Sequence, residues 1–354
     1  MTKNILLHLM LLLSIPVGAQ TVLDSTFLYT SAPFPSCHAA TIVETHTGDL
    51  VAAYFGGSWE GCRDVCIWMS RKEKRSSAWT APEVIADGLQ DDSTQHPCWN
   101  PVLFELPDRG VHPLILWYKT GLYIKDWVGY EKYSFDGGRT WGSPLRLYDN
   151  LGPIKNKPVF IKERRLPYCK GRLVCPSSRE NGNIWHTRFE YADFSRMSGF
   201  RWHSYAPGTP DSLRSIQPTI LRHRDGTLQA LCRTKEGTLS VTYSRDNGAT
   251  WTPEVLTDIP NPNSGIDAVT LRDGRFAMVY NPVGLNPGSE TGPRTPLVLA
   301  LSADGLHWTT VLTLEDQPGE YSYPSIIQGR DKTLHIVYTY NRRLIKYVHV
   351  TLRP

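Results

Sequence analysis

The sequence predicts an all-β fold, a six-bladed β-propeller, and three observations support this prediction. A unit of two apolar runs joined by a turn recurs six times, at intervals of roughly 50 to 60 residues. A shorter motif that contains Ser, Asp, Gly and Trp recurs between these units. Glycine, proline, tryptophan and tyrosine are abundant, with 28, 26, 11 and 17 residues. This composition suits many short strands joined by tight turns.

Each repeated unit begins with a polar residue, followed by a small residue or proline, an apolar run, a turn and a second apolar run. Two apolar runs that flank a turn predict a β-hairpin, and the spacing suits four-stranded blades with long loops. The six copies fill the chain after its first segment, so we expect a single domain over 20–354. The residues that open the units are His38, Asn100, Lys157, Gln217, Asp267 and Tyr323.

The first segment, 1–19, has the pattern of a signal peptide. Lys3 precedes an apolar run over 5–16, and small residues at 17–19 form a cleavage site. The apolar run is too short for a retained membrane span. We therefore expect an exported protein, periplasmic or extracellular. The net charge of +4 is too small to argue for a nucleic-acid partner.

The shorter motif predicts a structural turn. The segments SFDGGRTW (134–141) and SRDNGATW (244–251) both follow S-x-D-x-G-x-T-W, and SADGLHW (302–308) is one residue shorter. We expect Ser and Asp to hydrogen-bond the turn backbone, Gly to take the strained φ, and Trp to pack between blades. This motif is an Asp-box. Asp136 and Asp246 are therefore predicted to be structural rather than catalytic.

Asp-boxes on a six-fold repeat resemble the sialidase (neuraminidase) superfamily of BNR, or Asp-box, repeat proteins. The resemblance covers nearly all of the chain after residue 19, with divergence at several site positions. It implies a sialidase-like propeller and an exo-acting glycoside hydrolase, an exo-α-sialidase, that cleaves a terminal acidic sugar from glycans. Because a fold does not determine a function, the activity has to be inferred from the residues of the site.

The residues that open the innermost strands of a propeller converge at one end of its axis. All six of them are polar here, and basic residues gather in the loops that follow. Arginine forks match the geometry of carboxylates, so we expect a pocket for an anionic sugar, sialic or uronic. The predicted substrate-binding residues are Arg233, Arg294, Lys155, Lys157, Glu180, Asn100 and Tyr323.

Sialidases bind the substrate carboxylate with three arginines and use an Asp acid/base and a Tyr nucleophile that a Glu polarises. The resemblance implies that Arg233 and Arg294 are two of these arginines. It implies that Asp64 is the acid/base, with Glu60 as a rival on the same loop. Tyr321, in EYSYPSI, matches the setting of the nucleophile, and Tyr323 is its rival two residues later.

Two positions depart from the family pattern. Cys37 or His38 stands where the family has its first arginine, and Gln217 stands where the family has the Glu beside the Tyr. A glutamine cannot take a proton from a phenol, whose pKa is about 10. The alternatives are a water activated by Asp267, Glu180 or His38, or Tyr321 assisted by Glu320.

Three functions remain open on the sequence. The first is the exo-acting glycoside hydrolase. The second is a rhamnose–glucuronate-type polysaccharide lyase or uronate-directed hydrolase, in which cationic groups acidify the proton beside the uronate carboxyl. The third is a non-catalytic glycan-binding propeller, which Gln217 and the missing first arginine favour. We expect a monomer with an acidic glycan as partner. We expect no metal or other cofactor, since no His and carboxylate cluster has ligand spacing.

Overall fold

The computed structural model describes residues 20–90, 93–107, 113–162, 170–195, 199–208 and 213–352. The predicted signal peptide, 1–19, lies outside this part. The described residues form strands β1–β24 and one 3₁₀ helix, η1 (Ile124–Asp126). Among them no helix has the length and apolar character that crossing a bilayer requires.

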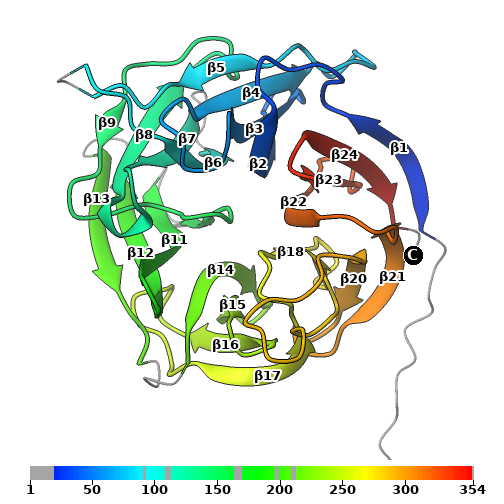
Figure 1. The fold of residues 1–354 in the computed structure, drawn as a ribbon. Coiled ribbons are helices and arrows are strands. Elements are labelled where there is room, and N and C mark those ends of the chain that lie inside the picture. Colours follow the sequence, from blue (N-terminus) through cyan, green and yellow to red (C-terminus); the bar gives the residue numbers. More distant parts are fainter. Residues whose placement is uncertain are drawn as a thin grey trace, which may run out of the picture.

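The strands form six four-stranded antiparallel sheets around a common axis, which confirms the predicted six-bladed propeller (Figure 1). Blade 1 contains β2 (Ser36–Glu44), β3 (Leu50–Gly57), β4 (Cys66–Lys72) and β5 (Glu83–Ala86), and blade 2 contains β6 (Cys98–Glu105), β7 (Leu114–Thr120), β8 (Val128–Ser134) and β9 (Leu145–Arg146). Blade 3 contains β10 (Val159–Lys162), β11 (Lys170–Asn181), β12 (Ile184–Ser195) and β13 (Gly199–Tyr205). Blade 4 contains β14 (Ser215–Arg222), β15 (Leu228–Thr234), β16 (Thr238–Ser244) and β17 (Val255–Pro260). Blade 5 contains β18 (Asp267–Thr270), β19 (Phe276–Tyr280), β20 (Leu297–Ser302) and β21 (Thr309–Glu315), and blade 6 contains β22 (Tyr321–Gln328), β23 (Leu334–Tyr340), β24 (Leu344–Thr351) and β1 (Thr21–Phe27).

The first strand of the chain closes the ring. β1 pairs with β24, with Thr21 opposite Thr351, and so becomes the outermost strand of blade 6 (Figure 1). Strands far apart in the sequence are thereby joined, and the closed ring leaves only short, protected sheet edges.

The hydrophobic core lies in layers between neighbouring blades. Every residue of β3 and of β7 is buried, because both faces of these strands pack against a neighbouring blade. Between blades 3 and 4, the rings of Phe189 and Trp251 stack with centroids 3.6 Å apart. Trp251 belongs to an Asp-box, so the predicted role of its tryptophan is confirmed there.

The Asp-box turns follow the third strand of their blades, as the hydrogen bonds of the first one show. Ser134 Oγ donates to Asp136 Oδ1 at 2.8 Å and accepts from Gly138 N at 2.8 Å. Thr140 Oγ1 donates to Asp136 Oδ2 at 2.6 Å. Burial acts to raise the pKa of Asp136, but these hydrogen bonds outweigh it and hold the pKa at about 2. The carboxylate is fully engaged in its turn, which supports a structural role.

Lys119 on β7 is a fully buried lysine between blades 2 and 3. Its ammonium donates to the carbonyl oxygens of Asn100 and Ile154, each at 3.4 Å, and to that of Pro153. Burial is the main cause that lowers the pKa of Lys119 from 10.5 to about 7, against the opposing effect of Glu190.

This lysine makes the stability depend on pH. Between about pH 7 and 10.5 the unfolded chain holds the Lys119 proton and the folded chain releases it, so the free energy of unfolding rises with pH. Below pH 7 both states are charged and the full penalty applies. We expect Lys119→Met to reduce this rise by a few kcal/mol, on the order of the shift. Denaturant unfolding at several pH values measures it, with the exposed Lys74→Met as control. An unchanged pH slope in Lys119→Met would contradict the assignment.

Candidate functional site

Four inner strands carry the same irregularity near their first residues. The pairing register skips two residues in β2, β6, β14 and β22. In each bulge one residue has a left-handed backbone, and these are Ala39 (φ 56°), Asn100 (34°), Gln217 (54°) and Tyr323 (50°). A bulge re-aims a side chain. The register therefore makes Ala39, rather than His38, the counterpart of Gln217 and Tyr323, and His38 stands one residue earlier.

The centre of the site is a hydrogen-bonded group of three side chains from blades 4 and 6. Arg233, at the end of β15, donates from Nη1 to the Tyr323 hydroxyl at 2.8 Å and to Gln217 Oε1 at 3.2 Å. Gln217 Nε2 also donates to the Tyr323 hydroxyl, at 3.2 Å. Two N–H donors thus face one phenolic oxygen, an arrangement that stabilises negative charge on that oxygen.

Arg233 is a buried cation whose hydrogen-bond partners are all neutral. Its side chain also donates from Nε to Asn263 Oδ1 at 2.6 Å, and the residue is only 7% exposed. Its guanidinium lies over the rings of Trp185 (5.2 Å) and Tyr323 (5.8 Å). No described carboxylate forms an ion pair with it. Because a buried charge normally needs a counterion, this arginine is poised for an anionic ligand.

Two more arginines lie beside this group and share one carboxylate. Arg294 Nη1 and Arg342 Nε each donate to Glu320 Oε1 at 2.8 Å. Arg342 also pairs with Glu60. Arg294 lies 5.8 Å from the ring of Tyr323. Arg233 and Arg294 thus lie against the ring of Tyr323, and Glu320 connects Arg342 to Arg294.

Arg342 is absent from the sequence prediction, which found Cys37 or His38 in place of the family's first arginine and named no substitute for it. It lies in the turn between β23 and β24, with a left-handed φ of 57°, and its carbonyl accepts from Cys37 N at 2.8 Å. In blade 4 Arg233 pairs with Ile216, and the equivalent residue of blade 6 is Thr339, which pairs with Ser322. Arg342 lies three residues beyond that position, so comparison of the repeats does not point to it.

His38 is buried beside Tyr323, with ring centroids 4.0 Å apart. Its Nδ1 lies 2.9 Å from Thr339 Oγ1, and its buried Nε2 has no partner among the described residues. Burial is the main cause that holds the pKa of His38 well below its usual value, and the charges of Arg342, Arg294, Arg233 and Lys155 add to it. The imidazole is therefore neutral at pH 7, with a free nitrogen inside the cationic site.

Of the predicted residues Lys155, Lys157 and Asp267, Lys155 lies nearest to this group, with its Nζ 5.8 Å from the centroid of the Tyr323 ring. Lys155 is buried and donates to the carbonyls of Ile266 (2.8 Å) and Pro324 (2.5 Å), and burial lowers its pKa to about 7. Lys157 Nζ pairs with Asp267 Oδ2 at 2.7 Å.

Asp267 holds neighbouring inner strands together. Besides Lys157, it accepts hydrogen bonds from Thr219 Oγ1 of β14 (3.0 Å), Ile326 N of β22 (2.9 Å) and Ala268 N (2.9 Å). Both carboxylate oxygens accept hydrogen bonds from these donors. Asp267 therefore connects neighbouring strands, and the structure does not support the predicted role in which it activates a water.

The loop carboxylates lie in three different settings. Asp64 is exposed and accepts from the backbone N (2.8 Å) and Oγ (2.6 Å) of Ser58 within its own loop. Glu60 is bound to Arg342. Glu180, near the end of β11, is half-buried and has no hydrogen-bond or ion-pair partner among the described residues. Burial raises the pKa of Glu180, while the charges of Arg233 and Lys235 oppose this rise.

Tyr321, the predicted nucleophile, points away from this site. Its side chain is 1% exposed and packs in the core between blades 5 and 6, with its ring 5.1 Å from that of Tyr340. The bulge after Ser322 turns Tyr323 toward the axis instead. Asn100 is buried at the equivalent bulge of blade 2, and its carbonyl accepts from Lys119.

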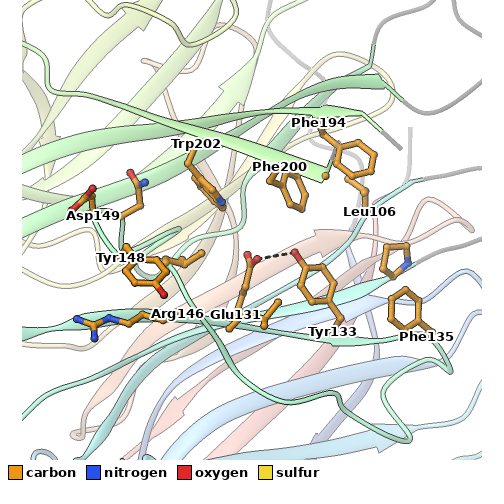
Figure 2. Close-up of a pocket in the computed structure, with 15 residues that line it drawn as sticks. Leu106, Glu131, Tyr133, Phe135, Arg146, Tyr148, Asp149, Phe194, Phe200 and Trp202 are labelled. Carbon is orange, nitrogen blue, oxygen red and sulfur yellow. Dashed lines mark hydrogen bonds between the residues drawn. The ribbon is translucent and has the colours of Figure 1, made fainter. Parts of the chain in front are cut away.

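A separate cavity of about 660 Å³ lies among the outer strands of blades 2 and 3. Figure 2 shows Phe194, Phe200 and Trp202 facing Tyr133 across it. Burial raises the pKa of Glu131 on its wall, which accepts from the Tyr133 hydroxyl at 2.9 Å. None of the described residues of the axial site lines this cavity.

Fold and site together define a class of protein, an Asp-box propeller with a cluster of arginines around a buried tyrosine near its axis. A family model described as a BNR repeat-like domain matches residues 48–336. The chain belongs to this family, which confirms both the predicted resemblance to BNR repeat proteins and the predicted fold.

Solved structures share the architecture. A protein of unknown function from Dyadobacter fermentans has a TM-score of 0.72 at 16% identity, over 96% of this chain and 100% of that chain. The intramolecular trans-sialidase from Ruminococcus gnavus has a TM-score of 0.66 at 13% identity, over 92% and 96%. Trypanosoma rangeli sialidase has a TM-score of 0.62 at 14% identity, over 90% of this chain and 55% of that chain. At such identities the likeness shows the fold alone.

Proposed function

We propose that this protein is an exported, exo-acting glycoside hydrolase that removes a terminal carboxylate-bearing sugar, sialic acid first among them, from glycans. The observation that carries the proposal is Arg233, a buried guanidinium with only neutral partners, flanked by Arg294 and Arg342. A sugar carboxylate is the counterion that this group lacks, and arginine forks bind it in a fixed orientation.

The side chains around the arginines suit cleavage of the glycosidic bond. Tyr323 is the nucleophile in this proposal, because its oxygen faces two donors at the centre of the pocket. His38 takes the tyrosine proton through one water, since Gln217 cannot and since His38 Nε2 makes no direct hydrogen bond to the Tyr323 hydroxyl. Glu180 is the general acid, because burial raises its pKa and keeps it protonated longer than an exposed carboxyl. Asp64, the acid implied by the family resemblance, is the rival.

Substrate binding itself activates His38 in this scheme. Burial, first, and four positive charges hold the pKa of His38 low in the free protein. A bound carboxylate offsets those charges, so the imidazole becomes a better proton acceptor once an acidic sugar is in place. A neutral sugar would not produce this change, and selectivity for acidic sugars then arises in catalysis as well as in binding.

The test is to incubate the protein with sialylated glycans and with uronate-capped polysaccharides and to measure product masses. Release of the free acidic sugar supports the proposal. A released sugar lighter by one water and without new ultraviolet absorption indicates intramolecular transfer by the same site. An ultraviolet-absorbing unsaturated uronate overturns the proposal in favour of a lyase. Saturable binding with no turnover on either substrate class overturns it in favour of a glycan-binding propeller.

A further inference from the structure

Three side chains of blade 6, none of which belongs to the axial site, bring possible metal ligands together. One ligand atom each of Asp331, His335 and His349 lies within 4.8 Å of the others. The cluster faces a cavity of about 600 Å³ between blade 6 and blade 1, which is lined in part by Leu50 and Lys72. The sequence pattern gives no hint of it, because 14 positions separate the two histidines.

The sheet register builds the cluster. His335 of β23 is paired directly with His349 of β24, so both side chains leave the same face of the blade. Asp331 lies in the turn that connects β22 to β23. In that turn Thr333 donates to Asp331 Oδ1 from its N (2.9 Å) and from its Oγ1 (2.7 Å), which fixes the carboxylate beside the histidines.

Second hydrogen bonds orient the ligand atoms. His335 Nδ1 lies 2.7 Å from the Tyr347 hydroxyl, which leaves its Nε2 for another partner. A Cβ placed on Gly329 would lie 2.7 Å from His335 Nε2 and 2.9 Å from Asp331 Oδ1, so these two atoms approach the same point beside that glycine. A histidine whose second nitrogen is held by a hydroxyl or carbonyl is typical of metal sites.

The charges favour a cation. Asp331 contributes a carboxylate that two hydrogen bonds from Thr333 hold beside the two imidazoles. Lys72, on the opposite wall, is already paired with Asp24 at 3.1 Å.

We propose that Asp331, His335 and His349 form a site for a divalent transition-metal ion of the Zn²⁺ class. Two imidazoles and one carboxylate are a donor set that Zn²⁺ accepts, with further positions open to water. The rings of His335 and His349 are stacked 4.5 Å apart without metal. His349 Nε2 lies 2.7 Å from Thr333 Oγ1, and coordination through this nitrogen would replace that hydrogen bond. Such an ion would link the turn before β23 to strands β23 and β24 of blade 6, the blade that closes the ring.

The test is calorimetric titration of the chelator-treated full chain with Zn²⁺. We expect one ion per chain, and at least about tenfold weaker binding in His349→Ala and in His335→Gln, a substitution that keeps the buried volume. Zn²⁺ should raise the melting temperature of the wild type and not of these variants. His307→Ala is the matched control, because His307 also contacts an aspartate, Asp304 at 2.6 Å, but is exposed.

Absence of stoichiometric Zn²⁺ binding by the wild type overturns the site. Binding that is equally tight in His349→Ala and His335→Gln does the same, because it places the ion elsewhere. Melting of each variant without metal shows whether its fold is intact. The axial site contributes no residue to this cluster, so the outcome is independent of glycan turnover.

Discussion

Arg233→Ala is expected to abolish turnover of acidic glycans and to weaken their binding by roughly 30-fold to several thousandfold, about 2–5 kcal/mol. The reason is that the substrate carboxylate would lose a buried guanidinium that has no carboxylate partner among the described residues. Arg233→Lys should recover only part of the affinity, because an ammonium lacks the planar fork. Initial rates and calorimetric binding with a sialylated oligosaccharide measure both effects.

The stability of a third variant, Arg233→Met, separates a functional from a structural role. A buried cation without a counterion destabilises the folded state, so Arg233→Met should melt at the same temperature as the wild type or higher. Arg275→Ala is the control for loss of an arginine, since its side chain pairs with Asp273 in a surface turn. Full activity in a folded Arg233→Ala variant would contradict the proposal that the axial site binds the substrate.

Tyr323→Phe is expected to lower kcat by about three orders of magnitude or more while substrate affinity changes less than about tenfold. The substitution deletes the hydroxyl that accepts from Arg233 and Gln217 and leaves the ring in place against His38. Loss of a nucleophile affects the chemical step, whereas the arginines still bind the carboxylate. Single-turnover kinetics and binding titration on the same glycan separate these two quantities.

Two residues earlier, the chain provides a matched control. Tyr321→Phe removes a hydroxyl from the core beside Tyr340 and should leave kcat unchanged with a small loss of stability. If Tyr321→Phe is inactive and Tyr323→Phe is active, Tyr321 rather than Tyr323 is the nucleophile, and the proposed role of Tyr323 is wrong. If neither variant loses activity, water rather than tyrosine attacks the sugar.

Most of the architecture can be predicted from the sequence because its signals are local. The alternation of apolar runs and turns predicts six hairpins, and the Asp-box residues bond within a few positions of one another. The polar residue ahead of each inner strand also predicts a pocket at the axis. Arg233, Arg294, Lys155 and Tyr323 gather there in the structure.

The direction of individual side chains is a different matter, because it depends on register and closure. Tyr321 and Tyr323 look interchangeable in the sequence, and only the bulge with φ of 50° at Tyr323 sends one to the axis and the other into the core. The sequence suggests that Asp267 is a free carboxylate. In the structure Thr219 of β14 and Ile326 of β22 each donate a hydrogen bond to one of its two oxygens.

Local pattern thus determines the number of blades, their turns and the polar character of the axis. Tertiary structure decides that Arg342 stands beside Glu320, that His38 lies against Tyr323, and that His335 meets His349. These contacts join positions from different strands or blades. Strand pairing and ring closure set them, and no periodicity along the chain encodes which distant residues will meet.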